Sequence, residues 1–315
     1  MLAITVPTFG GPDVLRAAEL PVPAPGPGQV LIAVESAGVG YVDVMARAGD
    51  YAPLAEPGFV PGLEAAGTVT ATGDDVDPAW TGRRVYALTW RGAYAEQVVA
   101  DLAGVVPLPT GVDAETAVAL GVNALVARTG LRRAGVQAGE RVLVRGAGGG
   151  IGVHAVQLAA AAGSEVTAVT SSAERGARLR ELGAAHVQDR ATARESADAY
   201  DVVVDTVAGP ELGHHLGRLR ANGRYVLCGG AGGAPSADAF DAIMTGFHRS
   251  PTLIALSLNS LGAAELAAAA AELFAPATTG ELRGIVDERF PLADAHRAHE
   301  RLEATPVFGR LTLHP

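Results

Sequence analysis

Cysteine, lysine and long apolar runs are what this sequence has least of. Cys228 is the only cysteine among 315 residues, so no disulfide can form within the chain and no multi-cysteine zinc site is possible. All 24 basic residues are arginine, and the formal net charge is −10. Because these arginines form no evident cluster, we expect neither nucleic acid nor an anionic membrane as a partner.

The missing apolar runs bear on membrane insertion and secretion. Glu, Gln or Gly interrupts each alanine-rich segment, which leaves no uninterrupted apolar stretch of about 18 residues for a transmembrane helix. Residues 1–10 lack the positive start and apolar centre of a secretory signal. Hydrophobic residues make up 49% and charged residues 18%, an ordinary globular balance. We expect a cytoplasmic protein that is long enough for two domains.

The most informative segment present is 141–172, which predicts a strand, a glycine loop, a helix and a second strand. An apolar strand over 140–145 leads directly into the loop; the helix follows over about 153–162 and the second strand over 165–170. Glycines at such a turn let the backbone approach a pyrophosphate, whose charge is met by N–H groups at the helix N-terminus. The strict G-x-G-x-x-G spacing is absent, because alanine holds the first position. The predicted phosphate-binding residues are Ala147, Gly148, Gly149, Gly150, Ile151 and Gly152.

The end of the second strand bears on which dinucleotide binds. NAD-binding units usually place Asp or Glu about 20 residues past the glycines, where it binds the ribose 2′-hydroxyl. Here Ser171 and Ser172 occupy that place, and Arg175 follows. Hydroxyls and a guanidinium suit a 2′-phosphate, whereas a carboxylate would repel it. We therefore expect NADPH rather than NADH; the alternative is a surface loop with an incidental arginine.

The chain has two regions of different character. Up to about residue 120, short strand-like runs between Pro- and Gly-rich turns predict a β-dominated domain. Beyond it, alternating strands and helices predict a doubly wound parallel sheet. Gly229 and Gly230 follow a predicted strand over 225–228, so they should join the glycine loop at the ligand-binding edge of that sheet. A final strand near 310–313 implies a return to the first domain and a substrate cleft between the domains.

Several short motifs, taken in order along the chain, resemble the medium-chain dehydrogenase/reductase superfamily. Within it, the similarity is to the zinc-free quinone oxidoreductase (ζ-crystallin-like) branch, and it covers essentially the whole length. The motifs lie at residues 37–43, 47–51, 61–67, 92–96, 146–152, 171–172, 182–184, 205, 291–295 and 309–310. The resemblance implies an α/β protein with a GroES-like β-rich catalytic domain over residues 1–121 and 259–315. It also implies a Rossmann NADPH-binding domain over residues 122–258.

The resemblance also identifies two substituted metal-ligand positions. Zinc-dependent relatives have a cysteine at the position of Gly40 and a histidine at that of Leu63, and neither replacement can ligate zinc. Quinone reductases of this branch commonly have Asn at the position of Gly40 and Thr at that of Asn123. The glycine should enlarge the pocket and remove a hydrogen-bond donor, which Asn123 could replace.

Without a metal, the resemblance implies that hydride moves from the nicotinamide C4 to a quinone or to an electrophilic carbon. Tyr51, Tyr41 and Asn123 are the candidate catalytic residues. Tyr51 is the preferred donor to a developing oxygen charge, and aromatic packing is the alternative role for both tyrosines. We expect a zinc-independent, NADPH-dependent reductase of a quinone or an α,β-unsaturated carbonyl compound. A biosynthetic enoyl or ketone reductase and an NADPH-binding protein with little turnover are the alternatives.

Two further expectations concern side-chain pairing and assembly. Asp43 and Arg47 lie four residues apart on a predicted helical turn, which favours an ion pair between them. Residues 252–258 form an apolar, β-prone run at the end of the cofactor sheet. An exposed edge of this kind needs covering, and relatives commonly pair there, so we expect a homodimer.

Overall fold

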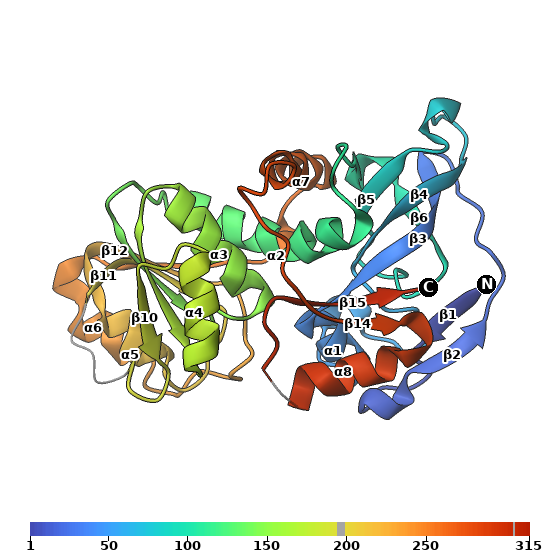
Figure 1. Cartoon of the computed structure of the whole chain (residues 1–315). Helices are drawn as coiled ribbons and strands as arrows, with labels where there is room; N and C mark the ends of the chain where they lie inside the picture. Colours follow the sequence, from blue (N-terminus) through green and yellow to red (C-terminus); the bar gives the residue numbers. More distant parts are fainter. Residues whose placement is uncertain (194–198, 305) are drawn as a thin grey trace. The chain divides into compact units, whose positions relative to one another are not determined.

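The computed structural model describes residues 1–193, 199–304 and 306–315, and its contacts divide the chain into two compact units (Figure 1). Unit 1 comprises Met1–Leu125 and Leu261–Pro315, and unit 2 comprises Val126–Ser260. The chain therefore leaves unit 1 once and returns to it.

Unit 1 is built on a sheet of seven described strands in the order β14-β15-β3-β4-β5-β7, with β6 paired to β3. The C-terminal strand β15 pairs antiparallel with β3, so that Leu311 lies opposite Val39. A separate antiparallel pair consists of β1 (Leu2–Thr5) and β2 (Arg16–Glu19). The strands of the large sheet are β3 (Gln29–Val39), β4 (Glu64–Thr72), β5 (Arg84–Leu88), β6 (Gln97–Asp101), β7 (Val105–Pro107), β14 (Val286–Pro291) and β15 (Arg310–His314).

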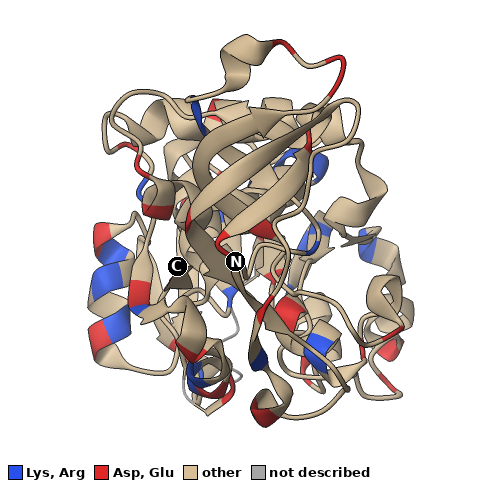
Figure 2. Ribbon diagram, turned by 90° about the vertical axis from the view of Figure 1, so that its right-hand side faces the viewer, with Lys and Arg blue, Asp and Glu red and all other residues tan. Residues whose placement is uncertain are grey.

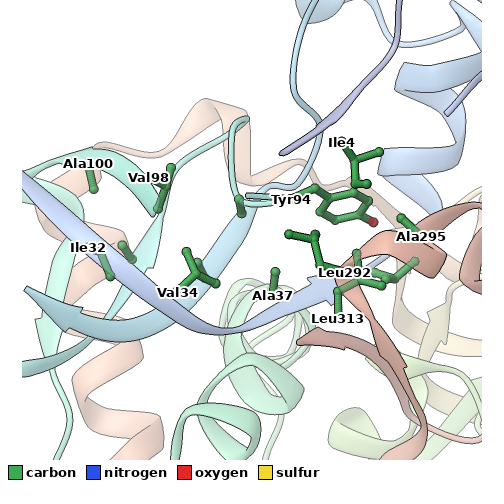
Figure 3. Close-up of a cluster of buried hydrophobic side chains, with 14 of the residues drawn as sticks. Ile4, Ile32, Val34, Ala37, Tyr94, Val98, Ala100, Leu292, Ala295 and Leu313 are labelled. Atoms are coloured by element: carbon green, nitrogen blue, oxygen red, sulfur yellow. The ribbon is translucent and has the colours of Figure 1, made fainter. Parts of the chain in front are cut away.

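The core of unit 1 lies against this sheet, and Figure 3 shows a part of it. Ile32 and Val34 alternate along β3 toward the cluster, as expected for a strand with one face buried. A register shift between Val34 and Ser36 then changes the alternation, so that Ala37 joins the same cluster. Other segments contribute Ile4, Tyr94, Val98, Ala100, Leu292, Ala295 and Leu313.

The α-helices of unit 1 are α1 (Tyr41–Ala48), α2 (Ala114–Arg133) as far as Leu125, α7 (Ala263–Ala277) and α8 (Ala295–Ala304). Short 3₁₀ turns link many of the elements, and three of them carry proline in the first turn, where its missing N–H costs no hydrogen bond. These turns are η1 (Pro12–Val14), η2 (Ala52–Leu54), η3 (Pro78–Trp80), η4 (Leu102–Gly104), η6 (Phe247–Arg249), η7 (Leu258–Ser260) and η8 (Leu292–Asp294).

Unit 2 contains six described strands in one parallel sheet, in the order β10-β9-β8-β11-β12-β13. This is the strand order of a doubly wound nucleotide-binding fold, and it confirms the predicted parallel sheet. The strand order reverses direction between β8 and β11. The strands are β8 (Arg141–Arg145), β9 (Glu165–Thr170), β10 (His186–Asp189), β11 (Tyr200–Asp205), β12 (Leu219–Leu227) and β13 (Thr252–Ala255).

Helices cover both faces of this sheet. Tyr225 of β12 packs in a buried cluster with Leu212 and Leu216 of α5 (Leu212–Gly217). The next residue, Val226, lies against Gly130 of α2. Because neighbours along a strand point to opposite faces, these two helices lie on opposite faces. The α-helices of unit 2, besides α2 from Val126 onward, are α3 (Gly150–Ala161), α4 (Ala173–Glu181), α5 (Leu212–Gly217) and α6 (Asp241–Thr245).

Charged residues are spread along the chain rather than gathered by sign, and Figure 2 shows Arg positions interspersed with Asp and Glu positions. Within the described ranges, no helix combines the length and apolar character needed to cross a bilayer.

Candidate functional site

The glycine loop of unit 2 joins β8 to α3 in one tight turn. The Gly149 N–H donates to the Gly146 carbonyl at 2.9 Å, and α3 begins at Gly150, earlier than the sequence predicted. A Cβ atom on Gly152 would overlap the Gly146 carbonyl oxygen, so this close approach of helix to strand requires glycine. The first N–H groups of α3, those of Gly150, Ile151 and Gly152, have no acceptor within the helix. Free N–H groups of this kind at a helix N-terminus can bind an anion such as a phosphate.

The loops after β11 and β12 lie beside it, at the carboxyl edge of the sheet. The Thr206 hydroxyl donates to the Arg145 carbonyl at 3.0 Å, which joins the end of β11 to that of β8. The Cys228 N–H donates to the Asp205 carbonyl at 2.9 Å, which joins the end of β12 to that of β11. The predicted residues Gly229 and Gly230 follow Cys228 directly. They therefore extend the same edge beside the end of β11, which borders the reversal of strand order where doubly wound sheets bind ligands.

The three residues proposed to select the dinucleotide lie between β9 and α4. Ser172 is the N-cap of α4, and its hydroxyl oxygen accepts the Arg175 N–H at 3.2 Å. This capping role was not predicted. A hydroxyl that accepts one hydrogen bond still has a proton to donate, so Ser172 can cap the helix and bind a phosphate oxygen. Ser171 is exposed and Arg175 is half-buried.

A buried ion pair at the base of the glycine loop was also not predicted. Arg145 Nη1 donates to Asp205 Oδ2 at 2.6 Å, and these residues face each other in the β8–β11 register. The Tyr225 hydroxyl donates to the same carboxylate, whose other oxygen accepts the N–H groups of Val207 and Ala208 at 2.8 and 3.0 Å. Burial, and after it the Asp205 charge, raise the pKa of Tyr225, which keeps its proton on the hydroxyl. This network fixes the loop that follows β11.

The residues around α1 in unit 1 do not pair as predicted. Asp43 accepts the Gly40 N–H at 2.8 Å and the Gly62 N–H at 3.2 Å. Arg47 instead forms two hydrogen bonds with Glu303, at 3.0 and 2.9 Å. The predicted Asp43–Arg47 ion pair is therefore wrong, because backbone donors at the start of the helix satisfy Asp43 and a carboxylate on α8 satisfies Arg47. Burial raises the pKa of Asp43 to about 6, against the opposing effect of the nearby Arg310 charge.

A second buried ion pair joins four segments of unit 1. Arg310 Nη2 of β15 pairs with Glu64 Oε1 of β4. The other carboxylate oxygen of Glu64 accepts the Tyr86 hydroxyl and the Val122 N–H, each at 2.8 Å. A Cβ atom on Gly40 would lie 3.0 Å from Arg310 Nη1. The guanidinium therefore lies next to Gly40, the position where the resemblance implies Asn.

Helix α2 is broken at this carboxylate. Gly121 has φ 15° and ψ −127°, which no helical residue adopts, and a Cβ atom there would overlap Glu64 Oε2. Asn123 follows in the first turn of the second helical part. Its side chain is only 7% exposed, and its Nδ2 has no hydrogen-bond partner among the described residues.

The three catalytic candidates differ in exposure and in surroundings. Tyr41 begins α1 directly after Gly40 and is 45% exposed. Gly40 lies next to Arg310, and Val122, the neighbour of Asn123, donates its N–H to Glu64. The Glu64–Arg310 pair therefore contacts both segments. Tyr51, in contrast, is half-buried and packs against the hydrophobic core of unit 1.

The residues at the two positions where the resemblance places zinc ligands do not fit a metal ion. Gly40 has no side chain, and Leu63 is a buried aliphatic residue. In the part of the chain that the structure describes, no three His, Cys, Asp or Glu side chains are close enough to share a metal. A catalytic zinc needs three protein ligands, and this donor set cannot supply them.

Comparison with known proteins agrees with this architecture. Residues 26–110 match the family described as alcohol dehydrogenase GroES-like domain, and residues 150–272 match zinc-binding dehydrogenase. A curated quinone oxidoreductase of Lama guanicoe is 33% identical over 99% of this chain and 97% of its own length. The quinone oxidoreductase of Pseudomonas aeruginosa is 32% identical over 98% of this chain and 97% of its own length.

Solved structures show the same similarity. A mycobacterial protein in complex with NADPH is 33% identical, has a TM-score of 0.91 and is matched over 100% of both chains. The quinone oxidoreductase of Thermus thermophilus, solved alone and with NADPH, is 32% identical with a TM-score of 0.86 and the same coverage. The predicted combination of a GroES-like domain and a Rossmann domain is confirmed. With a similarity that spans the whole chain, this protein belongs to the medium-chain dehydrogenase/reductase superfamily, in its ζ-crystallin-like quinone oxidoreductase branch.

Proposed function

We propose that this protein is a zinc-independent oxidoreductase that uses NADPH to reduce a quinone or an α,β-unsaturated carbonyl compound. The observation that carries the proposal is the glycine loop at the start of α3, followed by hydroxyls and an arginine where NAD-binding units carry an acid. The mycobacterial and Thermus relatives, which were solved with NADPH, support it.

The residues present fit this cofactor without a metal. N–H groups over Ala147–Gly152 would bind the pyrophosphate, and Ser171, Ser172 and Arg175 the 2′-phosphate. Gly229 and Gly230 would contact the dinucleotide at the sheet edge, where a Cβ atom on Gly230 would meet nothing within 4 Å. Bound NADPH would supply hydride from its nicotinamide C4. Tyr41, Tyr51 and Asn123 are the proposed donors to the oxygen of the substrate on which negative charge develops.

We also propose that the protein is a homodimer formed through β13. This strand ends the sheet of unit 2 and has no neighbour on its outer side within the described ranges. Three apolar side chains nearby in the sequence are largely exposed: Phe240 at 58%, Met244 at 74% and Phe247 at 74%. An open strand edge and exposed apolar groups suit a second copy of the same chain.

A panel of quinones and enones, assayed with NADPH and with NADH, tests the activity. We expect protein-dependent oxidation of NADPH by at least one acceptor. If no acceptor oxidises NADPH, the proposed reaction is wrong, and tight NADPH binding without turnover would indicate a nucleotide-binding protein.

The cofactor preference has its own test in Arg175. Arg175→Ala removes the guanidinium proposed to meet the 2′-phosphate, so we expect about tenfold weaker NADPH binding and unchanged NADH binding. Fluorescence titration of both nucleotides measures this. An equal loss for NADPH and NADH would contradict a role in selecting the 2′-phosphate.

A further inference from the structure

The break in α2 is produced by a residue far away in the sequence. Glu64 lies fully buried on β4, and its Oε2 occupies the space that a side chain at position 121 would need. The same oxygen accepts the Val122 N–H at 2.8 Å, as an N-cap side chain would. Glu64 therefore ends one helical part and begins the next.

Glu64 is itself held from two other directions. Arg310 pairs with its Oε1, and the Tyr86 hydroxyl donates to its Oε2 at 2.8 Å. A carboxylate with these partners has little freedom to move, and its position fixes the first turn that begins at Val122.

That first turn carries an unusual group. Asn123 Nδ2 is buried and unpaired within the described residues. Arg310 Nε, on the guanidinium that holds Glu64, is also buried and unpaired there. Buried donors without partners are uncommon in folded proteins, because their lost hydration is not replaced. A bound ligand that offers an acceptor would remove this cost.

We propose that Glu64 is a positioning residue, which breaks α2 so that the unpaired amide of Asn123 is held ready to donate to a carbonyl oxygen of a bound ligand. This inference rests on the proposed function, which offers two such oxygens. One is the carboxamide oxygen of the nicotinamide, and the other is the carbonyl oxygen of the quinone or enone. Both are neutral acceptors that an amide N–H suits.

Two nearly isosteric variants test the donor. Asn123→Thr puts a hydroxyl that can donate in place of the amide, whereas Asn123→Val has a methyl group in the position of that hydroxyl. Compared with the Val variant, we expect the Thr variant to show either about tenfold tighter NADPH binding or about tenfold higher kcat/KM for the acceptor. A difference in the Kd of NADPH, measured by titration without acceptor, identifies the nicotinamide carboxamide. A difference in kcat/KM for the acceptor with equal Kd identifies the substrate carbonyl.

If the Thr and Val variants agree in both measurements while unfolding at similar temperatures, the inference is wrong. The binding titration does not depend on turnover. A protein that oxidises no NADPH therefore contradicts the proposed reaction separately, and the inference then depends on the Kd comparison alone.

A second step tests the role of Glu64. Glu64→Asp keeps the charge that faces Arg310 but withdraws the carboxylate from the Val122 N–H. In this background we expect the tenfold difference between Asn123→Thr and Asn123→Val to disappear, since the first turn is no longer fixed. If Glu64 is only structural, Glu64→Asp lowers the unfolding temperature but leaves the difference between Asn123→Thr and Asn123→Val intact. That result would overturn the positioning role. Tyr86→Phe, which removes the hydroxyl that holds Glu64 Oε2 beside the Val122 N–H, serves as the second background if Glu64→Asp does not fold.

Discussion

At the scale of single residues, buried ionisable side chains show how strongly the fold controls charge. His299 is fully buried on α8, and its Nε2 lies 3.2 Å from the Tyr94 hydroxyl. Burial, and after it the Arg47 charge, lower the pKa of His299 to about 3. The imidazole is therefore neutral in the folded protein over the physiological range.

The buried histidine predicts acid sensitivity. Between about pH 6.5 and 3 the unfolded chain binds a proton at His299 that the folded protein does not, so stability falls as the pH falls through this window. Asp43 has the opposite effect, because its folded-state pKa is raised to about 6. Between pH 6 and the pKa of the unfolded chain, its protonation raises stability as the pH falls. As the pH falls below 6.5, the free energy of unfolding should fall less steeply for His299→Gln than for the parent protein, by about 1.4 kcal/mol per pH unit.

Urea unfolding at pH 7, 6 and 5 measures the effect of His299→Gln against the parent protein. His186→Gln is the matched control, because His186 is largely exposed on β10. Parallel pH dependences for His299→Gln and the parent protein would contradict the prediction.

At the scale of helices and strands, local patterns predicted some elements and missed those that depend on distant partners. The loop between β8 and α3 was predictable, because glycine spacing and apolar strands are local signals. Strand β10 was missed, since its sequence His-Val-Gln-Asp is polar and it lies at an edge of the sheet. The pair Arg145–Asp205 was missed because strand register brings its members together. The pair Glu64–Arg310 and the break at Gly121 were missed because they depend on contacts between segments far apart in the sequence.

The buried pair that joins β8 to β11 predicts a large stability effect. Arg145→Met leaves the Asp205 carboxylate buried without its counter-charge, so we expect a loss of about 3–5 kcal/mol in the free energy of unfolding. Arg84→Met is the control, since the Arg84–Glu35 pair is exposed and such pairs contribute about 1 kcal/mol or less. Urea unfolding compares the two, and losses of similar size would refute the special role of the buried pair.

The close approach between α3 and β8 predicts a loss of cofactor binding. Gly152→Ala places a methyl group against the Gly146 carbonyl and must displace the loop, so we expect at least about tenfold weaker NADPH binding. Gly217→Ala is the control, because a Cβ atom at Gly217 meets nothing within 4 Å. Equal affinities of the two variants would show that the loop does not bind the dinucleotide.

At the scale of the whole molecule, the open edge of β13 predicts the assembly. We expect light scattering at micromolar concentration to give twice the chain mass of 31.9 kDa. Leu253 is 37% exposed on β13, and Leu253→Arg should shift the protein to monomer by placing two like charges at the interface. A monomeric parent protein would contradict the proposed dimer.

The return of the C-terminal strand to unit 1 has a consequence for synthesis on the ribosome. Unit 2 is a continuous segment, so all of its residues are available while the last strands are still being made. Glu64 is made early, yet its counter-charge, Arg310, belongs to the last strand and completes the sheet beside β3. Until residue 310 emerges, the first strands of unit 1 carry an acid that cannot be buried at low cost. We therefore expect unit 1, which contains the first residues made, to complete its fold only after its C-terminal strands emerge.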